Sequence, residues 1–136
     1  MKPPFLLDTC AAIWFFDGVL PKAVNQLTEA INQGHSTYIS PITAWEAGVA
    51  ARKGRFASSL SPQRWFETLM GLPGIAVADM PPAVLIASQE LPGFPTDDPA
   101  DRIVAATARE YGLTVVTRDR ALRAYGKQGY LSVLEC

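Results

Sequence analysis

Four acidic residues are placed where they could bind one hard cation together. Asp8 ends a short apolar run, FLLD, and Asp119 lies two residues past a second run, LTVVT. Glu46 lies in a helix expected after a third β-rich run, TYIS, and Asp101 opens the helix expected before LTVVT. In open α/β sheets the functional crevice lies at the carboxyl ends of the strands. We therefore expect Asp8, Glu46 and Asp119 near one sheet edge, whereas Asp101 opens a helix that need not start there.

Carboxylates that converge need a positive partner, because like charges within a few Å raise one another's pKa. Mg²⁺ and Mn²⁺ prefer carboxylate oxygens and water as ligands. The only histidine is His35, before the second strand, so a zinc site built on several His and Cys ligands is excluded. Carboxylates that hold Mg²⁺ or Mn²⁺ at an open site suit phosphodiester hydrolysis, in which the metal activates water and neutralises developing charge.

Each acid also has a purely structural explanation. Asp8, Asp98 and Asp119 could each cap a helix that begins just after them, and Asp101 could stabilise a first helical turn through the helix dipole. Glu46 lies about six residues into its expected helix, which is too far for a cap. Capping explains single acids, but it does not explain four acids at one edge of a sheet.

Strand-like and helical patterns alternate along the chain. The expected strands are residues 5–8, 37–40, 74–79, 113–117 and, at an edge, 131–134. The expected helices are residues 23–33, 41–53, 61–70, 82–90 and 99–111. The first and fourth strands are apolar without alternation, which is typical of strands covered on both faces. This order predicts an α/β fold with a mostly parallel sheet of four to five strands and helices on both faces.

The composition is that of a globular protein. The 136 residues suit one domain, with 49% apolar and 18% charged residues and a net charge of −1. A charge near zero neither indicates nor excludes nucleic-acid binding, since local patches decide. The two cysteines do not form a disulfide framework, and no apolar run reaches the ~18 residues of a membrane span. We expect no signal peptide and no membrane partner, and a cytoplasmic location.

Four sequence blocks together resemble the PIN domain, and more narrowly the VapC toxins of bacterial toxin–antitoxin pairs. They are LLDT, SPITAWE, DPADRIVAATA and VVTRD, and the resemblance covers essentially the whole chain, residues 1–136, as a single PIN domain. It implies a three-layer α/β/α sandwich and a Mg²⁺- or Mn²⁺-dependent endoribonuclease. The implied catalytic and metal-binding acids are Asp8, Glu46, Asp101 and Asp119. The implied supporting residues are Thr9, Thr117 and Asp98, the last either as a support behind the metal ligands or as a helix cap.

The resemblance also implies two protein partners and shows one departure. The partners are a cognate antitoxin that covers the site and a second copy of the chain in a homodimer. Relatives often carry a histidine just upstream of the DPxDR segment, where this chain has Thr96 and Asp97.

Basic residues flank the expected acidic site and could bind RNA phosphates. The tentative RNA-binding residues are Arg52, Lys53, Arg55, Arg118 and Arg120. The alternative is that they are solvated helix ends. The aromatic residues of segments 14–16, 45 and 65–66 could stack on bases, line the core or receive a partner helix.

Two other functions fit parts of the pattern. A phosphoacceptor domain of the receiver type is also a small Mg²⁺-binding α/β fold, and Asp79 could be its acceptor. That fold needs a pair of acids after the first strand and a lysine after the fifth, whereas Asp8 stands alone and no lysine follows closely. A PIN-like module used only for binding is the second alternative, and the full acid set counts against it.

Overall fold

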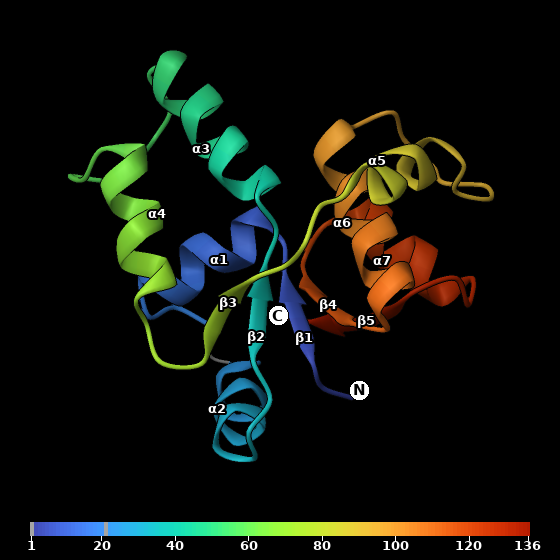
Figure 1. The fold of residues 1–136 in the computed structure, drawn as a ribbon, viewed down its shortest axis with the longest axis horizontal. Helices are drawn as coiled ribbons and strands as arrows, with labels where there is room; N and C mark the ends of the chain where they lie inside the picture. The colour runs from blue at the N-terminus through green and yellow to red at the C-terminus, as the bar shows by residue number, and fades with distance from the viewer. Residues whose placement is uncertain (1, 21) are drawn as a thin grey trace.

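A five-stranded parallel sheet forms the centre of the part of the chain that the computed structural model describes, residues 2–20 and 22–136 (Figure 1). The strands are β1 (Phe5–Leu7), β2 (Thr37–Ile39), β3 (Ile75–Val77), β4 (Thr114–Thr117) and β5 (Ser132–Glu135). Their order is β3-β2-β1-β4-β5, and every neighbouring pair is parallel. The carboxyl ends of β1 and β4 therefore lie side by side, because Leu7 pairs with Val116.

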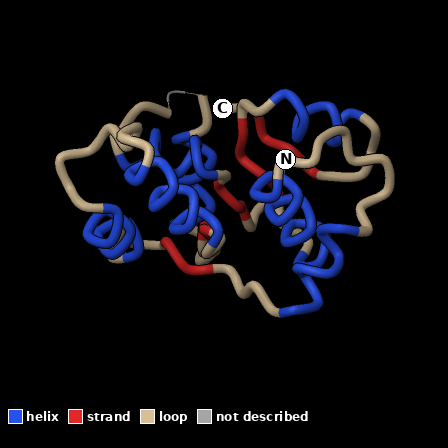
Figure 2. Tube along the Cα trace, turned by 90° about the horizontal axis from the view of Figure 1, so that it is seen from above, coloured by secondary structure: helices blue, strands red, loops and turns tan. Residues whose placement is uncertain are grey.

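Helices cover both faces of the sheet, as the view from above also shows (Figure 2). They are α1 (Thr9–Phe16), α2 (Val24–Asn32), α3 (Ile42–Arg52), α4 (Pro62–Met70), α5 (Pro82–Gln89), α6 (Pro99–Tyr111) and α7 (Arg120–Lys127). In Figure 1, α1, α3 and α4 lie on one side of the strands and α5, α6 and α7 on the other. The predicted three-layer α/β/α fold is confirmed.

Two hydrophobic cores follow from the alternation of side chains along the strands. Phe5 and Leu7 of β1 point into the core beneath α1 to α4, together with Trp65 of α4. Leu6, between them, points into the core beneath α6 and α7. Because β1 and β4 are buried along their whole length, their uninterrupted apolar sequence is explained.

Helix α6 begins and ends at the expected residues. The Asp98 side chain caps its first turn, Pro99 is its first residue, and Gly112 takes a left-handed conformation (φ 66°) just after its last. Helix α3 begins one residue later than expected, at Ile42, where the Ser40 hydroxyl accepts a hydrogen bond from the Ile42 N–H (3.1 Å). Such differences of one or two residues are usual at helix ends.

Helix α1 was missing from the expected elements and had entered only as an alternative explanation for Asp8. Its sequence, TCAAIWFF, lacks the alternation of apolar and polar residues that marks a half-exposed helix. Only Ala11 and Ala12 of α1 are buried, and its last four residues, 13–16, are partly buried against the core, so apolar residues lie around most of the helix. None of the helices in residues 2–20 and 22–136 combines the length and apolar character that crossing a membrane requires.

Candidate active site

Asp8 lies at the point where β1 ends and α1 begins. Its side chain is 6% exposed, and one carboxylate oxygen accepts a hydrogen bond from the Ala11 N–H (2.8 Å), which makes Asp8 the N-cap of α1. The other oxygen accepts a hydrogen bond from the Thr117 hydroxyl at the end of β4. Asp8 therefore caps α1 and also lies at the edge of the sheet beside β4, so the structural and the functional explanation hold together.

Thr117 connects two of the four acids. Its hydroxyl donates to Asp8 and accepts a hydrogen bond from the backbone N–H of Asp119 (2.9 Å). Asp119 in turn caps α7 by accepting from the Leu122 N–H (2.9 Å). Because Thr117 is fully buried, this chain of hydrogen bonds holds the ends of β1 and β4 together.

Glu46 is the fifth residue of α3 and is held by two threonines. The Thr9 hydroxyl donates to one carboxylate oxygen of Glu46, and it also lies 3.1 Å from the hydroxyl of buried Thr43. Since Thr9 follows Asp8 directly, this contact brings α3 to the same edge of the sheet as β1. The supporting position expected for Thr9 matches these contacts, whereas Thr43 was not singled out from the sequence, although it stands three residues before Glu46 on the same helix face.

Asp101 is the third residue of α6, and its backbone N–H donates to the Asp98 carboxylate (2.9 Å). The side chain of Asp98 is thus used as a cap, which matches its expected supporting role. Whether Asp101 joins the other acids could not be settled from sequence. In the fold, burial raises the pKa of the Asp101 carboxylate, which also lies close enough to Asp119, Asp98, Asp8 and Glu46 for their charges to raise that pKa further.

Burial and mutual repulsion raise the pKa of three of these acids. The pKa of Asp101 rises from 3.8 to about 7, chiefly through burial and then through the nearby carboxylates. Burial also raises the pKa of Asp8 and of Glu46, although the hydrogen bonds from Thr117 and Thr9 lower them in part. Titratable groups whose pKa is shifted by burial and by neighbouring charges cluster at functional sites, so this group of acids is the candidate active site.

Cys10 lies among the same acids and was not predicted to be there. Burial raises the pKa of its thiol to about 11, with further contributions from Asp8, Glu46, Asp101 and Asp119. A group outside the acid set is thus close enough to all four carboxylates to be affected by their charges.

The oxygen-rich character of the site fits a hard divalent cation. Its donors are carboxylates and hydroxyls, and burial of negative charge favours a positive ion. As the side chains stand, no three His, Cys, Asp or Glu groups within residues 2–20 and 22–136 lie close enough to enclose a metal ion. Mg²⁺ is usually bound by one or two carboxylates and keeps several waters, so the site does not need a closed cage.

Arg102, next to Asp101, fixes the loop before α6. Its guanidinium donates to the backbone oxygens of Thr96 (2.8 Å) and Ser88 (3.1 Å), lies over the ring of Phe94 (5.4 Å) and stands 3.6 Å from Asp97. Thr96 and Asp97, which stand where relatives often carry a histidine, are therefore both contacted by Arg102. This role was not predicted from the sequence, in which Arg102 had been read only as part of a motif.

The expected RNA-binding residues divide into two groups. All five are exposed, and no side-chain hydrogen bond or ion pair is found for Arg52, Lys53, Arg55 or Arg120 in residues 2–20 and 22–136. Arg118 is already engaged, because its Nε donates to the backbone oxygen of Cys136 (2.7 Å) and its guanidinium lies 4.2 Å from the centre of the Trp14 ring. Arg118 thus connects β5 to α1, and RNA contact is not needed to explain it.

The aromatic residues have different positions. Trp65 is 2% exposed and belongs to the core, where it contacts Phe16, Phe56 and Phe66. Trp45 is 54% exposed on α3, one residue before Glu46. Trp45 is therefore accessible to a base or a protein partner, whereas Trp65 as folded is not.

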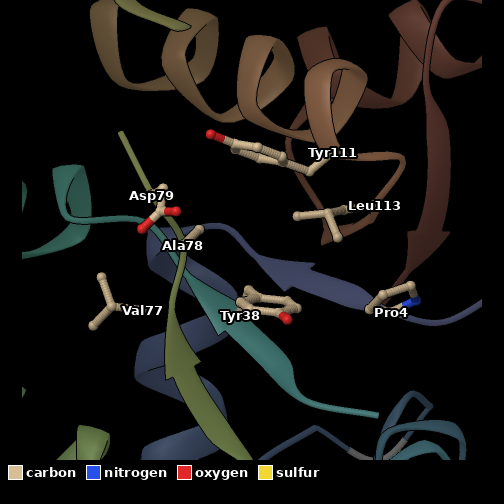
Figure 3. A pocket seen from close by; sticks show the side chains of 7 residues that line it. All are labelled: Pro4, Tyr38, Val77, Ala78, Asp79, Tyr111 and Leu113. Carbon is tan, nitrogen blue, oxygen red and sulfur yellow. The ribbon is translucent and has the colours of Figure 1, made fainter. Parts of the chain in front are cut away.

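Asp79 lies in a different cavity, of about 320 Å³, between β2, β3 and the end of α6 (Figure 3). Figure 3 shows Asp79 near Tyr38 and Tyr111, with Leu113 and Pro4 completing the wall. The lining holds neither a second acid nor a lysine. This arrangement lacks the charged groups that a phosphoacceptor site requires, so the receiver alternative gains no support.

The fold and the acid site together define a class of α/β protein with carboxylates gathered at the ends of parallel strands. The PIN domain model matches residues 5–128, and the chain belongs to the PIN domain family. The expectation drawn from the four sequence blocks is confirmed.

Three relatives illustrate the similarity. Over 121 residues the chain is 28% identical to Ribonuclease VapC22 of Mycobacterium tuberculosis (strain ATCC 25618 / H37Rv), which covers 88% of this chain and 90% of that protein. The structure of VapBC2 from Rickettsia felis bound to a DNA fragment from their promoter is similar with a TM-score of 0.70 at 16% identity, covering 96% of this chain and 97% of that one. DNA-bound VapBC from Salmonella typhimurium gives a TM-score of 0.60 at 23% identity, with 98% of both chains covered. At these identities the two structures support the fold.

Proposed function

We propose that this chain is a Mg²⁺- or Mn²⁺-dependent endoribonuclease, and that it is the toxin of a toxin–antitoxin pair. The observation that carries the proposal is the hydrogen-bonded arrangement at the ends of β1 and β4, in which Thr117 joins Asp8 to Asp119 and Thr9 binds Glu46. Burial raises the pKa of Asp101, and these carboxylates lie close enough to raise it further. Membership of the PIN domain family and similarity to a ribonuclease named VapC22 support the choice of RNA as the substrate.

Asp8, Glu46, Asp101 and Asp119 would hold the cation. A bound divalent ion supplies a Lewis acid that lowers the pKa of water and neutralises charge on the phosphate. The chain's own residues prepare that site. Thr117 and Thr9 direct the carboxylates of Asp8 and Glu46 through hydrogen bonds and leave their remaining lone pairs for other partners.

Asp101 must lose a proton before it can hold the cation. Burial, and then the neighbouring carboxylates, raise the pKa of Asp101 to about 7, so cation binding at neutral pH displaces this proton. Asp98 and Arg102 keep the start of α6 in place for this exchange.

The test is RNA cleavage by the wild type, Asp8→Asn and Asp101→Asn, with Mg²⁺ or Mn²⁺ and with EDTA. We expect each substitution to reduce cleavage at least about 100-fold, because each removes a charge that the transition state requires. Asp79→Asn, at the end of β3, is the matched control and should cleave like the wild type. Equal cleavage by all four proteins would show that a contaminating nuclease, and not this site, acts on the RNA.

The partners belong to the same proposal. The resemblance to VapC toxins and the similarity to VapBC complexes support a protein antitoxin as inhibitor and a homodimer of this chain, acting in the cytoplasm as one PIN domain over residues 1–136. Purification with the protein encoded by a neighbouring reading frame should abolish cleavage. Light scattering should give twice the chain mass for the toxin alone.

A further inference from the structure

A cavity beside the acid site is positioned to receive part of the substrate. It has a volume of about 240 Å³ and lies between α1, α3, α4 and the 55–58 loop. Thr9 and Glu46, which belong to the acid site, also line this cavity. The cavity and the acid site are therefore continuous, and a group held in one is next to a group held in the other.

The lining combines apolar side chains with hydrogen-bonding groups. Ala50 and Phe56 contribute apolar surface, whereas Asp17 and Ser58 contribute polar atoms. An aromatic ring with polar edges matches such a mixed lining. The volume of the cavity is below the roughly 300–1,000 Å³ of most small-molecule sites, so it suits a single ring system rather than a larger ligand.

The cavity lining carries charged groups of both signs, Asp17 and Glu46 against Arg55, and these suit the polar edges and the phosphate of a nucleotide better than an apolar protein side chain. Arg55 lines the cavity and is exposed, and it takes part in neither of the ion pairs found in residues 2–20 and 22–136. Its guanidinium is thus available for a phosphate. Single-stranded RNA is commonly recognised through bases that are splayed out of the stack and held by their edges.

We propose that this cavity, between α1, α3 and α4, holds one nucleobase of the RNA, adjacent to the phosphate that is cleaved, while Arg55 contacts the RNA backbone. The inference rests on the proposed ribonuclease function and adds a determinant of its sequence preference. Base insertion would fix the neighbouring phosphodiester against Glu46 and the other acids.

The experiment compares variants on RNA that carries or lacks one base. Cleavage of a random RNA pool by the wild type first locates the scissile bond. Synthetic oligonucleotides then carry either the preferred base or an abasic ribose at the nucleotide on each side of that bond. For one of these positions we expect the abasic substrate to lower wild-type kcat/KM about tenfold, in line with the contribution of a single bound base.

The matched variants are Ala50→Met, which fills the cavity, and Ala51→Met, which adds the same side chain to the next residue of α3, outside the lining. We expect Ala50→Met to lose about tenfold on the normal substrate and to be insensitive to the abasic change. Ala51→Met should behave like the wild type. Circular dichroism and Tm verify folding, and Ala57→Phe, at an exposed position of the same lining, replaces Ala50→Met if the latter does not fold.

The outcomes separate the two proposals. If the wild type cleaves no RNA with either metal, the ribonuclease function and this inference both fail. If the wild type cleaves RNA but Ala50→Met keeps the full abasic effect, only the base-binding cavity is refuted. If Ala50→Met keeps the abasic effect and escapes inhibition by the antitoxin, the cavity is a docking site for protein and the assignment to RNA is overturned.

Discussion

Replacing Asp101 by asparagine should stabilise the metal-free protein while it abolishes activity. The carboxylate of Asp101 is partly buried beside Asp119, Asp98, Asp8 and Glu46, and its pKa rises from 3.8 to about 7. A carboxyl group whose folded-state pKa exceeds its unfolded value binds a proton more tightly when folded. The protein therefore loses stability as the pH rises from about 4 to about 7, and the full cost is present above pH 7.

The size of the effect follows from this pKa. A rise from 3.8 to about 7 corresponds to about 4 kcal/mol against the charged form. Because the side chain is only partly buried, solvent screening reduces the net gain to roughly 1–2 kcal/mol. For a chain of 136 residues this corresponds to a Tm increase of roughly 3–8 °C at pH 8.

Thermal unfolding measured in EDTA at pH 8 and pH 4 tests the argument. Asp101→Asn should have the higher Tm at pH 8, and the difference should shrink at pH 4, where wild-type Asp101 is about half protonated in the unfolded chain and fully protonated in the folded one. Adding Mn²⁺ should raise the Tm of the wild type more than that of the variant, since ligand binding stabilises by about 2.7 kcal/mol at 100 times Kd. Asp79→Asn serves as the control for removing a charge elsewhere. A lower Tm for Asp101→Asn at pH 8 in EDTA would refute the electrostatic reasoning.

Three further predictions follow from the same contacts. Thr117→Val removes the hydroxyl that donates to Asp8 and accepts from the Asp119 N–H, and it should weaken Mn²⁺ binding about tenfold in calorimetry. The control is Thr114→Val in the same strand, whose hydroxyl bonds to Lys2 and Ser132; it should lower Tm without changing Mn²⁺ affinity. Arg118→Ala should lower the free energy of unfolding in urea by about 1–3 kcal/mol, because it removes contacts with Cys136 and Trp14. In the inactive Asp8→Asn background, Arg118→Ala should weaken RNA binding less than Arg55→Ala does, and the opposite ranking would place Arg118 on the RNA. Cleavage at limiting Mg²⁺ should increase with pH between about 6 and 8, because Mg²⁺ must displace the proton that Asp101 holds with a pKa of about 7, and a flat profile would contradict that role.

Local signals in the sequence were enough to predict α6, because Asp98, Pro99 and Gly112 mark both ends of that helix. Local signals were not enough to predict α1, because apolar residues lie around most of this helix and it has no distinct polar face. Asp8 could be assigned to the site since it directly follows a buried strand. The position of Asp101 depends on where the loop between α5 and α6 places the start of α6 relative to the sheet, and no local sequence pattern specifies that position.

The role of Arg118 was also beyond local sequence. From local sequence, a basic residue just after a strand fits a contact with phosphate as well as a contact within the protein. Its actual partners, Trp14 and the backbone of Cys136, come from opposite ends of the chain and meet it only because β5 lies beside β4. Long-range pairing of this kind decides which charged side chains remain available for a ligand.

The use of Asp8 and Asp119 as helix caps limits how this protein can lose its activity during evolution. An apolar replacement at either position would leave backbone N–H groups of α1 or α7 without an acceptor. Asparagine or serine would keep the cap and remove the charge. A descendant that kept the fold for binding alone should therefore carry small polar residues at these two positions, whereas position 46, which caps nothing, would be free to vary.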